Sequence, residues 1–371
     1  MSVSNLKYKE IMKKMRSEDE DERRYIANLL GEIKKEEGIK PLIHLLFDTS
    51  PAVQEAAADS LVKIGTKKVV REIIPLLRSE DASLRNIAVE ILEGIGEKAI
   101  EPLSSLLQDK DHDIRKFACD ILGNIGSSKA INSLIPLLND QHINVACAAA
   151  EALGNIKSKK ATQALIEALK GRKWLTYNAI EALGKIGDTR AIKPIAQFLF
   201  KDDPLISFAS VKALGEIGDP EGAEYLLPLL GSDTFNKEVI KALAKIAKKN
   251  GKKKIFSFIK NKIKIDLLKK FLKDPDPEVR KSAIYLAGII KDKKTVPLLI
   301  PLLSDNEQEQ DIWEEGVKAL LEINPELDYL TIELEEKIKQ TLEIFLYDND
   351  EKLRVAADRA LRKLSRMAGE N

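Results

Sequence analysis

Hydrophobic residues recur along this chain in blocks of about 30 residues, separated by short polar segments. Each block contains an LGxIG-like motif, and the first residue of the motif serves here as an anchor. The first eight anchors are 29 to 31 residues apart, and the last three intervals are 44, 33 and 41 residues. The anchors are Leu30, Leu61, Leu92, Leu122, Leu153, Leu183, Leu214, Leu243, Ala287, Leu320 and Leu361. The pattern predicts about eleven copies of one structural unit, which we call repeats.

Apolar residues surround each anchor at helical spacing. An aliphatic residue lies eight positions before the anchor, usually an alanine four before it, and an isoleucine three after it. These offsets follow one stripe of an α-helix, and the small alanine lets two helices approach closely. A glycine after the isoleucine suits the end of this helix; such glycines are Gly65, Gly96, Gly126, Gly187 and Gly218. Each repeat also has an earlier, proline-containing segment, which predicts a first helix. Pro136 and Pro228 lie deeper in that segment and are expected to bend it.

The helix pairs are therefore expected to bury their apolar stripes against neighbouring pairs, as in a solenoid. The pattern Asp–x5–[V/I/L]-R…A…LGxIGD…AIxPL resembles HEAT repeats, in particular the short HEAT-like repeats of phycobilisome (bilin) lyase subunits, from about Ser17 to Lys363. The resemblance implies an all-α, right-handed α-solenoid (superhelix) of about eleven HEAT-like helix pairs. It also implies a ladder of aspartate and arginine residues between repeats. The motif supplies Asp109/Arg115, Asp274/Arg280 and Asp348/Arg354, whereas Asp48 and Asp140 lack the arginine and Arg23 and Arg85 lack the aspartate. A broken ladder is therefore predicted.

Two irregular intervals interrupt the array. About thirteen extra residues lie between Leu243 and Ala287, and about ten lie between Leu320 and Leu361. Either insertion is a short helix or a lengthened loop. Because no Gly/Ser-rich linker separates them, we expect one continuous solenoid. Its regular repeats cover residues 1–247, a lysine-rich insertion covers 248–262, and less regular repeats cover 263–371.

Composition excludes several classes of function. Lys and Arg total 60 against 59 for Asp and Glu, so the net charge does not favour a polyanion partner. Two cysteines, Cys119 and Cys147, cannot form a disulfide framework or a four-cysteine zinc site. The first residues lack the apolar core of a signal peptide, and no apolar run approaches membrane-spanning length. We therefore expect a cytoplasmic monomer that does not insert into membranes.

The sequence also lacks the patterns typical of catalysis. His44, His112 and His142 form no HExxH motif, and there is no Ser–His–Asp set, P-loop or Rossmann fingerprint. HEAT-repeat deoxyhypusine hydroxylases need paired His–Glu motifs that this chain does not have. His112 and His142 occupy similar turns one repeat apart, near Asp111 and Asp113, and are interpreted as solvated turn residues. We expect no catalytic residue, metal or cofactor.

Offsets −9, −6, −2 and +2 from the anchor form a second, solvent-facing stripe, which lines the concave surface in HEAT-like arrays. The residue at offset −2 is acidic in repeats two to six and mostly basic in the later repeats. At offset −6, Cys147, Tyr177 and Phe208 occupy positions that are mostly polar or charged in other repeats, and Trp174 lies one helical turn before Tyr177. Alternatively, Trp174 folds under its turn and Phe208 packs between helices. The predicted partner-binding groove consists of Trp174, Tyr177, Phe208, Cys147, Asp120, Glu151, Glu181, Lys212 and Lys241.

The favoured interpretation is a non-enzymatic scaffold that binds a protein or peptide along the concave face. One alternative, implied by the resemblance, is a subunit of a bilin lyase-like enzyme. Another is binding of nucleic acid or an anionic surface between Lys248 and Lys270, where ten lysines face one acid, Asp266. Arginine, which suits phosphate and guanine, is absent from that stretch. The lysines proposed for a polyanion patch are Lys252, Lys253, Lys254, Lys260, Lys262 and Lys264.

Overall fold

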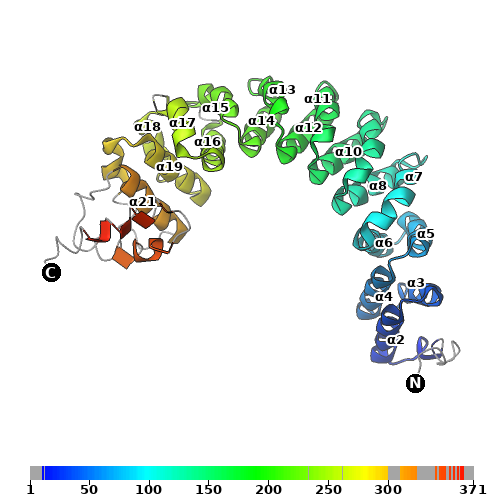
Figure 1. The fold of residues 1–371 in the computed structure, drawn as a ribbon. Coiled ribbons are helices and arrows are strands. Elements are labelled where there is room, and N and C mark those ends of the chain that lie inside the picture. Colours follow the sequence, from blue (N-terminus) through cyan, green and yellow to red (C-terminus); the bar gives the residue numbers. More distant parts are fainter. Residues whose placement is uncertain are drawn as a thin grey trace. The chain divides into compact units, whose positions relative to one another are not determined.

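In the computed structural model, all regular structure in the described part of the chain is helical (Figure 1). The described residues are 11, 13–232, 234–260, 262–299, 310–323, 339–340, 342–347, 351, 354–355, 357–358 and 360–362. The chain divides into two compact parts, Met1–Ile186 and Gly187–Asn371, which we call the N-terminal and C-terminal parts. None of the described helices combines the length and the apolar character that crossing a lipid bilayer requires.

The second helices of the repeats occur where the anchors predict them. In the N-terminal part they are α2 (Glu20–Ile33), α4 (Pro51–Ile64), α6 (Ala82–Ile95), α8 (His112–Ile125), α10 (Ile143–Ile156) and α12 (Lys173–Ile186). In the C-terminal part they are α14 (Pro204–Ile217), α16 (Asn236–Asn250), α19 (Pro277–Ile290) and α21 (Gln310–Ile323). Each contains one anchor, so the consecutive helix pairs of an all-α solenoid are confirmed. The repeat anchored at Leu361 and the insertion at 324–337 lie mostly outside the described residues. The predicted right-handedness stays a prediction.

The first helices are shorter and form a second layer in each part (Figure 1). They are α3 (Ile39–Leu45), α5 (Lys67–Ile73), α7 (Ile100–Leu106), α9 (Ile131–Leu134) and α11 (Thr162–Ala168), followed in the C-terminal part by α13 (Ile192–Ala196), α15 (Pro220–Leu226) and α18 (Ile265–Phe271). One-turn 3₁₀ helices precede many of them: η2 (Glu36–Gly38), η4 (Gly96–Ala99), η5 (Ser128–Ala130), η7 (Lys159–Ala161) and η8 (Thr189–Ala191). A further one, η10 (Lys293–Thr295), precedes the helical residues 296–299. The lysine-rich insertion contains an additional helix, α17 (Lys252–Ile259).

The deeper prolines change the type of helix. Pro136 lies in the 3₁₀ helix η6 (Ile135–Asn139), directly after α9, and Pro228 lies in η9 (Leu227–Leu229), directly after α15. Pro75 occupies the same place in η3 (Ile74–Arg78) after α5. Because proline has no N–H and its ring collides with the carbonyl four residues earlier, the α-helical ladder stops there. The expected bend is therefore a switch from α to 3₁₀ geometry.

The ends of the second helices follow the predicted glycine rule. Gly65, Gly126 and Gly218 have φ angles of 50°, 71° and 71°, in the left-handed region that glycine adopts without steric cost. Where glycine is missing, a lysine takes that conformation instead; Lys34 and Lys157 both have φ of 54°. The helix therefore ends at the same position even where the preferred residue is absent.

A different glycine sets the distance between neighbouring second helices. It follows the anchor directly and faces the residue that precedes the next anchor. A Cβ added to Gly123 would lie 2.7 Å from the Cα of Ala152, and one added to Gly154 would lie 2.7 Å from the Cα of Ala182. The same relation holds for Gly215, which faces Ala242. These glycines, rather than the mid-stripe alanines alone, allow the backbones to approach closely.

Candidate functional site

Six of the nine predicted groove residues lie at exposed or half-buried positions of α8, α10 and α12 in the N-terminal part. We call this surface the acidic–aromatic face; it consists of Asp120, Cys147, Glu151, Trp174, Tyr177 and Glu181. Trp174 is 55% exposed, so its ring does not fold beneath the turn. Glu151 is exposed, and the other four residues are half-buried. The close contacts of Gly123 with Ala152 and Gly154 with Ala182 bring the three helices next to one another.

Lysines partly neutralise the charge of the acidic–aromatic face. Lys116 Nζ is 2.7 Å from Asp120 Oδ2 on the same helix. Lys185 Nζ on α12 is 4.0 Å from Glu151 Oε1 on α10 and donates a 2.9 Å hydrogen bond to Asn155 Oδ1. Because these groups are exposed or half-buried, such pairs contribute little to stability and mainly shape the local potential. The aromatic residues, rather than the carboxylates, distinguish this face from an ordinary solvated surface.

The remaining three predicted groove residues belong to the C-terminal part. Phe208 on α14 is 41% exposed and Lys212 is also exposed. Lys241 on α16 is already paired, since its Nζ lies 3.4 Å from Asp276 Oδ2 and 3.5 Å from Glu238 Oε1. The Lys241 ammonium group is therefore neutralised by acids of its own part.

Sequence reasoning missed two apolar residues near Phe208. Phe200, in the turn before α14, is 68% exposed, and Leu205 lies on the first turn of α14 and is also exposed. A signal was present, because Phe200 is fourteen residues before its anchor, as is the exposed Phe47 in an earlier repeat. Most other repeats have a polar residue there.

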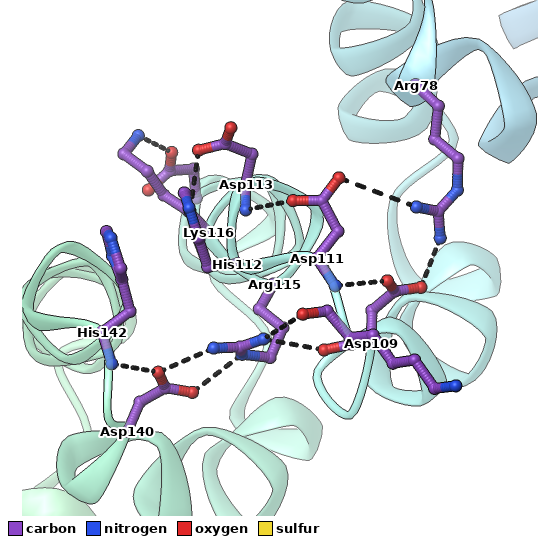
Figure 2. Close-up of polar contacts among 11 residues, drawn as sticks. Arg78, Asp109, Asp111, His112, Asp113, Arg115, Lys116, Asp140 and His142 are labelled. Atoms are coloured by element: carbon purple, nitrogen blue, oxygen red, sulfur yellow. Dashed lines mark hydrogen bonds and ion pairs between the residues drawn. The ribbon is translucent and has the colours of Figure 1, made fainter.

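Two arginines at offset −7, Arg23 and Arg115, connect successive repeats, and Figure 2 shows the link made by Arg115. Arg115 donates to the carbonyl oxygen of Asp109 at 2.8 Å in its own turn. Its Nε and Nη2 donate to the two carboxylate oxygens of Asp140 in the next repeat, at 2.8 and 2.9 Å. Arg23 and Asp48 form the same bidentate pair at 2.7 and 2.9 Å.

The predicted gaps in the ladder at Asp48 and Asp140 are therefore wrong, because the arginine of the preceding repeat pairs with each of them. Arg115 uses only the backbone carbonyl of Asp109, and its carboxylate partner lies 25 residues further on. Arg85 donates to the carbonyl oxygens of Ser79 and Glu80, but no ion pair joins it to the equivalent aspartate, Asp109, which like Asp48 and Asp140 lies thirteen residues before its anchor. Asp109 pairs with Arg78 instead.

The pKa values of the ladder carboxyls reflect these contacts. The hydrogen bonds from Arg23 lower the pKa of Asp48, although partial burial opposes the shift. For Asp140, partial burial acts to raise the pKa, but hydrogen bonds from Arg115 and from the His142 N–H together hold it below the ordinary value. Both carboxylates therefore favour the charged state in the folded protein.

The two turn histidines are stacked on each other, which the sequence did not predict. The rings of His112 and His142 are 3.8 Å apart between centroids and 5° from parallel. Ligand atoms of Asp111, His112 and Asp113 lie within 4.8 Å of one another at the exposed start of α8 (Figure 2). However, Asp111 caps α8 by accepting the Asp113 N–H at 2.9 Å, and His112 Nδ1 is 3.1 Å from Asp113.

This arrangement favours a structural role over a metal site. An imidazole binds a metal in its own ring plane, so two parallel rings 3.8 Å apart cannot direct lone pairs at the same ion. Nδ1 of His142 is buried and has no hydrogen-bond partner in the described part of the chain. The stacked pair joins the starts of α8 and α10, the second helices of the fourth and fifth repeats.

Neither cysteine has the features of a reactive thiol. Cys119 is fully buried, and burial raises the pKa of its thiol to about 12. Cys147 is half-buried; burial also raises its pKa, against the opposing effects of Arg172 and of a hydrogen bond with Asn178. A thiol in either environment remains protonated at neutral pH and is a poor nucleophile.

The lysine-rich stretch divides into engaged and solvated side chains. Lys252 forms an ion pair with Glu322, and its Nζ lies 4.9 Å from the ring centroid of Tyr285. Lys260 lies 4.9 Å from the ring of Phe256. By contrast, Lys253, Lys254, Lys262 and Lys264 are exposed and form no ion pair with any described residue. Only part of the predicted patch is thus available to a partner.

Comparison with protein families agrees with this architecture. The family profile for HEAT repeats matches residues 8–93, 70–142, 100–176, 170–247 and 235–315. No curated protein matches the chain significantly. Among solved structures, the crystal structure of an engineered protein from the Northeast Structural Genomics Consortium is 22% identical, with 96% of this chain and 98% of that chain covered and a TM-score of 0.41. Since the overlapping matches extend over more than half of the chain, the protein belongs to the HEAT-repeat family.

Proposed function

We propose that this protein is a non-enzymatic scaffold whose acidic–aromatic face binds a helix or an extended peptide of a partner protein. HEAT repeats generally form protein-interaction surfaces. The observation that carries the proposal is the exposure of Trp174 in a chain with only two tryptophans. A tryptophan ring gains much free energy when a partner covers it, and such residues are frequent energetic centres of interfaces.

The charges around Trp174 indicate the chemistry of the partner. Glu151 is exposed on α10, the second helix of the preceding repeat, and Glu90 and Asp59 continue the acidic positions on α6 and α4. A partner segment with an apolar anchor and flanking basic residues fits this surface. Because Lys116 and Lys185 reduce the net charge, the acids are expected to affect association rate and orientation more than affinity.

The C-terminal part carries a second candidate contact. Phe200, Leu205 and Phe208 form an exposed apolar group at the start of α14, and the proposal assigns them to additional partner contacts. A monomeric, cytoplasmic, right-handed superhelix without catalytic residues or cofactors is part of the same proposal.

Affinity purification with quantitative mass spectrometry tests the proposal. The wild type is compared with the double variant Trp174→Ala/Tyr177→Ala and with Phe47→Ala, which removes an aromatic ring of similar exposure, 54%, from another repeat. Partners should disappear with the double variant and remain with the control. Direct titration of a captured partner should then show weakening by about 2 kcal/mol or more, roughly 30-fold. Equal capture by all three proteins would refute the assignment of this face.

A further inference from the structure

The C-terminal part presents lysines that its own structure does not use. We define the lysine face as Lys253, Lys254, Lys262, Lys264 and Lys269, on α17, on α18 and between them. All five are exposed, and none pairs with an acid among the described residues. Between residues 252 and 264 there is no Asp or Glu, and on α18 only Asp266 offsets the charge.

Three neighbouring lysines have structural contacts with other helices of the same part. Lys248 and Lys252 approach the Tyr285 ring at 5.1 and 4.9 Å. Lys249 Nζ donates a 2.7 Å hydrogen bond to the carbonyl oxygen of Ile217, at the end of α14. These side chains stabilise contacts between helices. The five lysines of the lysine face form no ion pair with a described residue that would give them such a role.

The start of α17 increases the positive potential. Lys252, Lys253 and Lys254 occupy its first turn, and Gly251 provides no side-chain cap. Three other helices of this part begin at an aspartate cap: Asp203 for α14, Asp219 for α15 and Asp276 for α19. Cations at a helix N-terminus add to the positive end of the helix dipole, which disfavours them. An external anion near these lysines relieves that repulsion.

The composition of this surface favours a lipid bilayer over nucleic acid. No arginine, the side chain most used to read phosphate and guanine, occurs between residues 248 and 270. Half-buried apolar groups lie among the lysines instead, including Phe258, Ile265 and Leu267. Clustered lysines on an amphipathic helix bind anionic headgroups, and partly exposed apolar side chains gain from the headgroup–acyl boundary.

We propose that the lysine face adsorbs to an anionic lipid surface, with the lysine ammonium groups against phosphate and carboxylate groups of the lipids. Each lysine near such a surface raises the partition coefficient by about fivefold. The binding is peripheral, since α17 packs against α15, α16 and α19 and its Ile255 and Ile259 are buried. The lysine face and the acidic–aromatic face share no residue and belong to different parts of the chain, so this proposal is independent of the proposed partner site.

Co-sedimentation of the full chain with vesicles tests the proposal. One set of vesicles contains phosphatidylcholine alone, and the other contains roughly one third phosphatidylserine. The test variant is Lys253→Ala/Lys254→Ala/Lys262→Ala/Lys264→Ala. The matched control, Lys35→Ala/Lys40→Ala/Lys63→Ala/Lys160→Ala, removes the same charge from four exposed lysines of the N-terminal part that also lack ion pairs with described residues.

Wild type and control should sediment with the anionic vesicles only, and more weakly at higher salt. The test variant should lose at least about tenfold in partition coefficient while keeping its circular dichroism spectrum and melting temperature. Absence of wild-type binding, or equal losses in both variants, would overturn the proposal. So would tighter binding to random duplex DNA than to the vesicles at the same salt concentration, since that outcome identifies a nucleic-acid surface. Trp174→Ala should bind vesicles like the wild type.

Discussion

At the scale of single residues, the arginine at offset −7 shows how one side chain connects two repeats. Arg115 neutralises Asp140 through two hydrogen bonds while it satisfies carbonyl groups of its own turn. Arg85 makes only the carbonyl contacts, since Asp109, the equivalent aspartate, pairs with Arg78 instead. The two arginines therefore form a natural pair for measuring the contribution of the link between repeats.

Arg115→Met should lower the free energy of unfolding by about 1.5–3 kcal/mol, the range for hydrogen bonds to charged groups. The loss arises because Asp140, whose side chain is only 9% exposed, keeps its charge without its main partner. Urea denaturation followed by circular dichroism measures this change. Arg85→Met is the control and should cost less. Equal losses for the two variants would show that the carbonyl contacts, rather than the Asp140 pair, provide the stability.

Acid should weaken the same link. The folded-state pKa values of Asp48 and Asp140 are lowered, so their contribution is complete above the ordinary carboxyl pKa of about 4. It is lost as the pH falls through the depressed folded-state values. Stability should therefore decline below about pH 4, and Asp140→Asn should decline less steeply. Urea titrations across this pH range measure the slopes, and identical slopes for wild type and Asp140→Asn would contradict the assignment.

At the scale of helices, the glycine after the anchor determines how closely neighbouring second helices pack. Gly154 faces the backbone of Ala182, which cannot rotate away. Gly222 on α15 has room for a methyl group, since an added Cβ would lie 3.6 Å or more from its neighbours, at ordinary van der Waals distance. The same substitution should therefore have opposite effects at the two positions.

Gly154→Ala should destabilise the protein by about 1–3 kcal/mol, because α10 and α12 must separate to accept the methyl group. Gly222→Ala should be neutral or stabilise by about 0.4–1 kcal/mol, since alanine restricts the unfolded chain and favours the helix. Chemical denaturation of both variants tests the contrast. Destabilisation of similar size at both positions would mean that helix packing is not limited by Gly154.

At the scale of the whole molecule, stability comes from contacts between neighbouring repeats within each compact part. Leu153 is fully buried on α10, and α10 packs against both α8 and α12. No single central core exists in such an array; the loss of one anchor weakens two interfaces at once. The effect of an anchor substitution should therefore spread along the chain.

Leu153→Ala should cost about 2–5 kcal/mol, as for other buried leucines. Amide hydrogen exchange should accelerate in α10 and also in α8 and α12. Lys160→Ala, at an exposed position nearby, should leave exchange unchanged and alter stability by less than about 0.5 kcal/mol. Faster exchange confined to α10 would contradict coupling between repeats.

Local periodicity determined the elements of this protein from the sequence alone. The stripe of apolar residues around Leu153 and the glycines such as Gly126 act through contacts three or four residues apart, so they specify each second helix and its end. The family resemblance follows from the same repetition. The spacing of 25 residues in Arg23/Asp48 and Arg115/Asp140 was also present in the sequence, but Asp48 and Asp140 were predicted to lack an arginine, because the arginine of the preceding repeat was not considered.

Only the tertiary structure decided which side chains meet and which stay free. The contact of Gly154 with Ala182, the stacking of His112 on His142 and the engagement of Lys252 by Glu322 join residues about 30 to 70 positions apart. Such contacts depend on the distance and rotation between packed helices, which no local pattern encodes. For the same reason, the exposure of Trp174 and the separation of engaged from solvated lysines on α17 became visible only once the helices were packed.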